Sequence, residues 1–293
     1  MLIFGSVGLF VRYIPLPSSI IALVRGVVGC LFLLAAMFLM RKKMSITRIR
    51  ADVWVLLFSG IAIGINWIFL FQAYRYTTIA NATICYYIAP VIVVFLSPFI
   101  LKEKLTAVKV CCILAAVTGI FLITGFGGQI GVSSGENDLM GIFFGLGAAV
   151  FYASVIMLNK FFRHVTDLER TVIQLAFAAL SLLPYVLMTV SFDALEFTIT
   201  GVTLLLTLAI VHTGFSYYLY FSGLRTLKGQ TAALLSYIDP LTAILLSVLI
   251  LSEKMGVWQI IGGILILGGT LFNELSYKDK HKDKVTEASS HNE

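Results

Sequence analysis

Long runs of apolar residues, separated by short polar connections, dominate this chain of 293 residues. Nine of the runs hold about 20 residues each, the number that an α-helix needs to cross the roughly 30 Å hydrocarbon core of a bilayer. The run Met1–Val11 is also apolar, but at about 1.5 Å per residue it would reach only about 16 Å. The pattern predicts a short first helix and then spans near 18–40, 52–74, 78–100, 105–125, 138–159, 169–191, 200–223, 229–251 and 255–275.

Composition argues against a soluble globular protein. Apolar residues make up 59% of the chain and charged residues 12%, and the mean hydropathy is +0.97. Soluble domains are about 45–50% apolar and about 25% charged. The net charge of +6 comes from basic residues that flank apolar runs, so we expect a lipid bilayer and no nucleic acid as partner. The four cysteines lie inside apolar runs without a metal-ligand spacing, which predicts neither a metal site nor a cofactor.

Basic residues are concentrated in alternate connections, which indicates the orientation of the chain. If Met1–Val11 runs outward, the connections after the second, fourth, sixth and eighth helices are cytoplasmic and hold most of the 21 Lys and Arg. The polar segments 127–137 and 192–200 contain no Lys or Arg. We therefore expect a multi-pass protein of the cell (plasma) membrane with ten helices and both termini cytoplasmic, an extracytoplasmic linker at 126–137, and a disordered cytoplasmic tail at 276–293.

The chain contains an internal repeat at an offset of 150 residues. Tyr87-Ile88-x-Pro90 matches Tyr237-Ile238-x-Pro240, and Leu101-x-Glu103-Lys104 matches Leu251-x-Glu253-Lys254. Each half would hold five helices, and because five is odd the second half would enter the membrane from the opposite side. The repeat predicts two inverted five-helix halves, 1–125 and 138–275, an arrangement typical of secondary transporters.

These motifs resemble the drug/metabolite transporter superfamily, in particular its EamA type. The resemblance rests on the duplicated hinges Leu101-Lys102-Glu103-Lys104 and Leu251-Ser252-Glu253-Lys254, and on the glycines that follow the second one. It implies a ten-helix bundle, a solute path between the halves, and export of amino acids, drugs, sugars or other metabolites. It also implies further residues upstream of Phe4, which are absent here, so the first helix is expected to be truncated.

Proline at matched positions in two spans suggests a binding site at the membrane midplane. Pro90 and Pro240 each remove a backbone donor, so both helices are expected to kink there. Asp239, which precedes Pro240, is an ionisable residue at membrane depth, and such residues usually face a cavity. It has three possible roles: binding a cationic group of a solute, exchanging a coupling proton, or pairing with Arg25.

Polar and aromatic residues near these prolines complete the candidate substrate site. His212, Ser216 and Tyr220 are spaced at i, i+4 and i+8, which places them on one helix face. Plain packing remains an alternative for the aromatic residues and for His212. The candidate substrate-binding residues are Asn66, Trp67, Asn81, Tyr87, His212, Ser216, Tyr217, Tyr220, Tyr237 and Asp239.

No P-loop and no catalytic motif occurs in the sequence, so we expect no enzyme activity, no catalytic residue and no direct use of ATP. The leading hypothesis is a secondary transporter, an exporter of amino acid-like or other amphipathic solutes that works by alternating access. The alternatives are a structural or receptor-like membrane protein and an intramembrane enzyme. The sequence does not indicate the substrate, the coupling ion or the oligomeric state.

Overall fold

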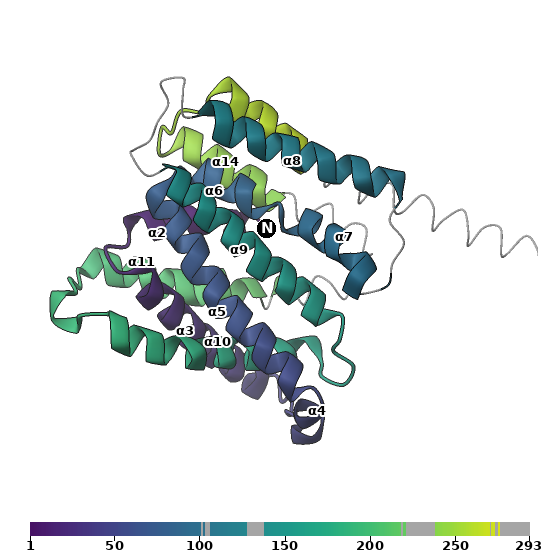
Figure 1. Ribbon diagram of the computed structural model, residues 1–293. Helices are drawn as coiled ribbons and strands as arrows, with labels where there is room; N and C mark the ends of the chain where they lie inside the picture. The colour runs from purple at the N-terminus through teal and green to yellow at the C-terminus, as the bar shows by residue number, and fades with distance from the viewer. Residues whose placement is uncertain are drawn as a thin grey trace, which may run out of the picture.

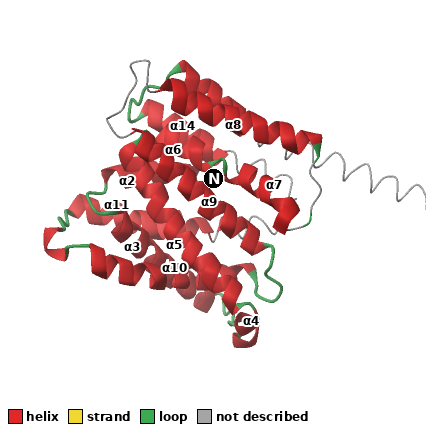
Figure 2. Cartoon of the chain, in the orientation of Figure 1, coloured by secondary structure: helices red, strands yellow, loops and turns green. Residues whose placement is uncertain are grey.

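The computed structural model describes residues 1–100, 102, 106–127, 138–217, 219, 220, 238–269, 271, 272 and 275. Helices joined by short connections make up this part of the chain, which contains no strand (Figures 1 and 2). Their bounds are α1 Leu2–Gly5, α2 Val7–Tyr13, α3 Ser18–Leu39, α4 Ile46–Ala51, α5 Val53–Tyr76, α6 Ile79–Tyr86, α7 Ala89–Ile100, α8 Ala107–Gly127, α9 Asp138–Asn159, α10 Asp167–Thr189, α11 Ile199–Ala209 and α14 Ile238–Leu249. A final helix covers Val257–Gly269.

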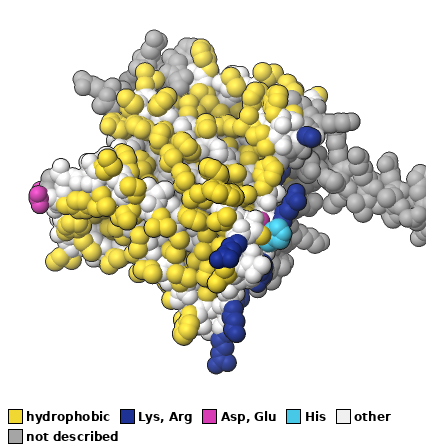
Figure 3. Space-filling view, turned by 60° about the horizontal axis from the view of Figure 1, so that its bottom comes forward, with side chains coloured by type: hydrophobic (Ala, Val, Ile, Leu, Met, Phe, Trp, Pro, Cys, Tyr) yellow, Lys and Arg dark blue, Asp and Glu magenta, His cyan; other side chains and the backbone are white. Residues whose placement is uncertain are grey.

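Where their residues are described, the predicted spans coincide with helices. Five helical stretches are long and apolar enough to cross a membrane, and five shorter apolar helices accompany them within the described residues. The first helix is short, as the sequence predicted, because α1 and α2 together cover only Leu2–Tyr13. Hydrophobic side chains cover most of the surface in Figure 3, where Lys and Arg gather toward one edge. An apolar exterior of this extent matches a lipid environment.

The α5 helix runs through the middle of the bundle and packs against α9 and α10 (Figure 1). Gly60 permits the close approach to α10, since a Cβ at this position would lie 2.5 Å from the Cβ of Phe177. The α3 helix packs against α10 and α11, and α6 packs against α9 and α14. Each of these pairs joins the first half of the chain to the second, so the two halves share one interior.

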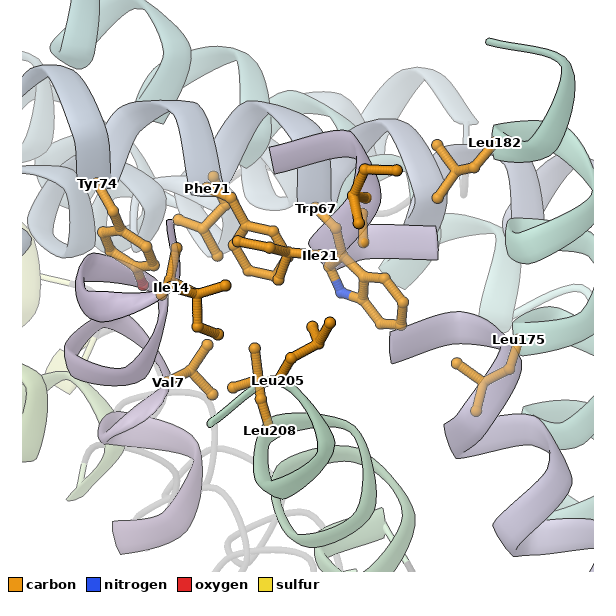
Figure 4. Close-up of a cluster of buried hydrophobic side chains, with 14 of the residues drawn as sticks. Val7, Ile14, Ile21, Trp67, Phe71, Tyr74, Leu175, Leu182, Leu205 and Leu208 are labelled. Atoms are coloured by element: carbon orange, nitrogen blue, oxygen red, sulfur yellow. The ribbon is translucent and has the colours of Figure 1, made fainter. Parts of the chain in front are cut away.

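A continuous apolar cluster fills that interior (Figure 4). Trp67, Phe71 and Tyr74 extend from α5 and are at most 6% exposed. Side chains from four other helices meet them. These are Val7 and Ile14 at the first helix, Ile21 from α3, Leu175 and Leu182 from α10, and Leu205 and Leu208 from α11.

Candidate functional site

The fourth apolar helix is broken next to Pro90, at the position that the sequence predicted. The α6 helix ends at Tyr86, Tyr87 and Ile88 form a turn, and α7 begins at Ala89. Within the break the hydrogen bonds tighten to the i→i−3 pattern, from Ile88 N to the Cys85 carbonyl (3.3 Å). The break fits the missing amide hydrogen of proline and its clash with the preceding turn. Pro240 lies in the first turn described of α14, and the residues before Ile238 are outside the described part.

The turn at Tyr87 contacts the matched helix of the second half. The Tyr87 hydroxyl donates a 2.6 Å hydrogen bond to the Asp239 carboxylate, which is partly buried in the first turn of α14. The side chains of Arg25, Tyr74 and Tyr217 lie close enough to Asp239 to interact with its charge. No ion pair joins Asp239 to Arg25 among the described residues. The direct partner of the Asp239 carboxylate in this structure is the Tyr87 hydroxyl.

Arg25 organises a second part of this region. Its guanidinium Nε donates to the Thr213 hydroxyl at 2.5 Å, and its charge lies 4.6 Å from the centre of the Trp67 ring and 5.7 Å from that of Phe71. Only 5% of Arg25 is exposed. A cation over an aromatic face gains about 0.5–2 kcal/mol, so these contacts offset part of the cost of a buried charge. Trp67, a predicted substrate contact, stacks on this cation.

A π-helical turn at Ile210–Phe215, which sequence reasoning missed, interrupts the eighth apolar helix. The Ser216 and Thr213 hydroxyls donate five residues back, to the carbonyls of Val211 (2.8 Å) and Leu208 (3.4 Å). Such wide turns are frequent at functional sites. The turn changes the face on which the predicted stripe of His212, Ser216 and Tyr220 lies. A Thr-Gly pair inside an apolar run was the only signal in the sequence, and it is a weak one.

His212 faces the first helix of the chain. Its Nε2 lies 2.9 Å from the Ser6 hydroxyl, and its ring centre is 4.4 Å from that of Phe10. Tyr217 and Tyr220 approach the same helix, with ring centres 5.6 Å and 6.3 Å from that of Phe4. The short first helix thus contacts three of the predicted residues on the eighth.

Asn66 and Asn81 form hydrogen bonds away from Asp239. Asn66 is 3% exposed and donates to the Ala148 carbonyl at 2.7 Å, so it holds α5 to α9. Asn81 is 1% exposed and donates to the Thr77 hydroxyl at 3.4 Å, while its Oδ1 has no partner within the described part of the chain. Tyr237 lies outside the described residues.

A pocket of about 660 Å³ opens at a different place from the predicted cavity. It lies where the beginning of α3 meets the ends of α5 and α10, and none of the nine predicted substrate residues that the structure describes lines it. Its walls are Pro15, Pro17, Ser18, Ser19, Ile68, Gln72, Arg75, Tyr76, Tyr185, Thr189, Val190, Ser191 and Leu195.

Two buried carboxylates join the halves at the end of the bundle that the basic residues predict to be cytoplasmic. Asp52, at the start of α5, accepts hydrogen bonds from the amides of Arg163 (3.3 Å), His164 (2.9 Å) and Val165 (3.1 Å). Its other oxygen lies 3.0 Å from the His164 ring nitrogen. Burial acts to raise the pKa of Asp52, but these hydrogen bonds outweigh it, and the pKa is lowered.

Glu169 makes the reciprocal contact from the second half. It accepts from the Ser45 amide at 2.9 Å and lies 3.6 Å from Arg48, both of the first half. It also completes a capping box with Thr166 at the start of α10. We call the Asp52 and Glu169 contacts together the Asp52–Glu169 contacts.

A third carboxylate joins the halves at the opposite end. Glu253, in the second hinge motif, accepts from the Ile79 amide at 2.9 Å and from the Ser247 hydroxyl. It also lies 3.8 Å from Arg12. The first amides of a helix lack partners within the helix, so Glu253 caps α6. The matched Glu103 lies outside the described residues, as do 128–137 and 276–293.

No group of three or more His, Cys, Asp or Glu side chains that could hold a metal lies within the described residues.

The family model described as the EamA-like transporter family matches residues 1–125 and 139–274. The uncharacterized transporter YxxF of Bacillus subtilis (strain 168) is 31% identical over 276 residues, which cover 92% of this chain and 85% of that protein.

Two further comparisons agree with this match. The uncharacterized inner membrane transporter YicL of Salmonella typhimurium (strain LT2) is 25% identical over 285 residues, which cover 93% of this chain and 92% of that protein. A solved crystal structure matches with a TM-score of 0.64 at 18% identity, and the match covers 95% of this chain and 94% of that one. At this identity the likeness concerns the fold alone.

Proposed function

Because the chain belongs to the EamA-like transporter family, we propose that this multi-pass membrane protein is a secondary transporter that exports a small metabolite by alternating access. The observation that carries the proposal is the Tyr87–Asp239 hydrogen bond. It joins the broken helix of one half to the matched helix of the other, next to the paired prolines. Discontinuous helices at corresponding positions of two repeats mark the solute site in several transporter folds.

The packing supports two halves related by a pseudo-two-fold axis. Such an axis brings matched helices together, and α3 packs against its match α10. The match of α14 is α7, and α14 packs against α6, which belongs to the same predicted span as α7. The fifth helices also meet, because a Cβ on Gly119 would lie 2.6 Å from the Gly262 carbonyl oxygen. The pairing of α5 with α9 has its counterpart in α11 with α2. The two separate matches to the family model support the same boundaries.

The carboxylate contacts at both ends supply elements that alternating access requires. In the orientation that the basic residues favour, the Asp52–Glu169 contacts hold the two halves together at the cytoplasmic side of the plasma membrane. The contact of Glu253 with the Ile79 amide holds them together at the outer side. A transport cycle would break one set of contacts while the other persists, because a path open at both ends would be a channel.

The chemistry around Asp239 favours a solute with an amino group, such as an amino acid-like or other amphipathic compound. A carboxylate supplies a counter-charge for an ammonium group, and the surrounding tyrosine rings attract cations. The same carboxylate is a candidate carrier of a coupling proton, since an unpaired charge at this depth is costly and protonation removes it.

Solute counterflow in proteoliposomes tests this function. Purified full-length protein would be loaded with one unlabelled amino acid or amphipathic amine at a time and supplied with the labelled compound outside. We expect uptake for at least one compound, and at least a tenfold loss with Asp239→Asn because the counter-charge is gone. Asp193→Asn, at an exposed connection, is the matched control and should behave as wild type.

Two results would contradict the proposal. Absence of counterflow for the whole panel, with folded and inserted protein, would favour the structural or receptor-like alternative. Wild-type rates and pH dependence in Asp239→Asn would remove this carboxylate from the solute and proton path, even if transport itself is observed.

A further inference from the structure

The pocket at the beginning of α3 contains polar groups that the transport proposal does not use. Its volume of about 660 Å³ falls within the range of about 300–1,000 Å³ that is usual for small-ligand sites. Its lining includes one positively charged side chain, that of Arg75, and no acidic one. The charge of the walls therefore favours an anion.

The start of α3 presents unpaired donors to this pocket. The 22-residue helix has Pro17 at its N-cap, without a capping side chain. Its first bonded amide is that of Ile21, which donates to the Pro17 carbonyl at 3.1 Å. The amides of Ser18, Ser19 and Ile20 precede it and have no acceptor among the described residues. Free amides and the helix dipole together attract anionic groups.

Ser19 is an independent indication of a ligand. It is 7% exposed, and its hydroxyl has no hydrogen-bond partner within the described part of the chain. The hydroxyl is nevertheless not sealed in the protein, because Ser19 lines the pocket. By contrast, the neighbouring Ser18 donates to the Gln72 side chain at 3.2 Å. A buried hydroxyl that reaches only a pocket is expected to bind whatever fills it.

Arg75 supplies the positive charge without a carboxylate partner among the described residues. One of its guanidinium nitrogens, Nη2, donates to the carbonyls of Ile14 (3.4 Å) and Leu16, which fixes the side chain against the connection that leads into α3. The other guanidinium nitrogens remain available to a ligand. Each of these nitrogens can donate a single charge-assisted hydrogen bond to an oxygen of a carboxylate or phosphate.

We propose that this pocket binds an anionic oxygen group, a carboxylate or phosphate, between Arg75, the Ser19 hydroxyl and the first amides of α3. The site is separate from Asp239 and does not rest on the proposed transport. The group belongs either to a free small anion or to a phospholipid headgroup, since α5 and α10 both end here and Tyr76 and Tyr185 are exposed beside the pocket.

Thermal unfolding of the purified full chain tests the free anion. Sodium phosphate and sodium acetate would be titrated against sodium chloride at equal ionic strength, so that screening is the same in each series. If a free anion binds, the unfolding midpoint should rise with either ion relative to chloride. Ser19→Ala and Arg75→Gln should each raise the apparent dissociation constant by at least about tenfold, as expected for a lost hydrogen bond to a charged group.

Native mass spectrometry of the same proteins with added phosphatidylglycerol tests the headgroup. Retained lipid that is reduced in both variants would support the headgroup form of the site. Ser97→Ala is the control, since Ser97 is also buried but donates to the Val94 carbonyl at 3.0 Å in α7. If Arg75→Gln fails to fold, Ser19→Ala decides alone. Equal responses of wild type and Ser19→Ala in both experiments would overturn the proposal.

Discussion

The contacts of Asp52 with the second half of the chain give the sharpest test of how the two halves are held together. Asp52 is 5% exposed, and one of its oxygens accepts three amide hydrogens while the other meets the His164 ring. Asp52→Asn keeps the shape of the side chain and removes its charge. The variant therefore isolates the electrostatic part of the contact.

The magnitude follows from the four contacts. The asparagine carbonyl can still accept the three amides, so those hydrogen bonds weaken from charged to neutral rather than disappear. A neutral hydrogen bond contributes about 1 kcal/mol and one to a charged group about 1.5–3 kcal/mol. The carboxylate also interacts with the start of α5, which contributes about 0.3–1 kcal/mol. Because the three amides share one oxygen, we take the low end of each range and expect a loss of about 2–3 kcal/mol in the free energy of unfolding.

Thermal unfolding of the purified protein measures this loss. At about 2–4 °C per kcal/mol for a large domain, the midpoint should fall by roughly 5–10 °C. The difference should also depend on pH. The hydrogen bonds lower the pKa of Asp52 in the folded protein. Its contribution is therefore fully present above the ordinary aspartate pKa of about 3.9, and it is lost progressively as the pH falls from there through the lowered pKa of the folded protein.

Asp167→Asn is the matched control for this experiment. Asp167 pairs with Arg170 at 2.8 Å, but its side chain is 66% exposed, and exposed pairs contribute about 0–1 kcal/mol. The reasoning is refuted if Asp52→Asn lowers the midpoint no more than Asp167→Asn, or if its effect does not diminish at all as the pH falls below about 3.9.

Two further variants test the packing and the outer contact. Gly119→Ala would place a Cβ 2.6 Å from the Gly262 carbonyl oxygen and should lower the free energy of unfolding by about 1–3 kcal/mol. Gly268→Ala is the control, because a Cβ there meets nothing within 4 Å and the change should be neutral or slightly stabilising. Equal unfolding midpoints for the two variants would contradict the contact between Gly119 and Gly262. Glu253→Gln keeps an acceptor for the Ile79 amide but removes the charge, and should lower stability by about 1–2 kcal/mol in the same assay, so an unchanged midpoint would argue against the cap.

The sequence by itself determined the class of protein and the positions of its helices. The bilayer requires about 20 apolar residues for each span, and a membrane interior leaves no alternative to internal backbone hydrogen bonds. These constraints act on local segments, so α3, α5 and α9 could be predicted to within a few residues. The break before Pro90 was predictable for the same reason, because proline acts on its own helix.

Contacts between distant segments were decided by the tertiary structure alone. Nothing local indicates that Asn66 packs against the Ala148 carbonyl, or that Glu253 caps α6 from 174 residues away. The π-helical turn at Ile210–Phe215 also depends on its surroundings, since Arg25 binds it through Thr213. Apolar periodicity shows which residues avoid water but not which helices meet, because lipid and a neighbouring helix are equally apolar partners.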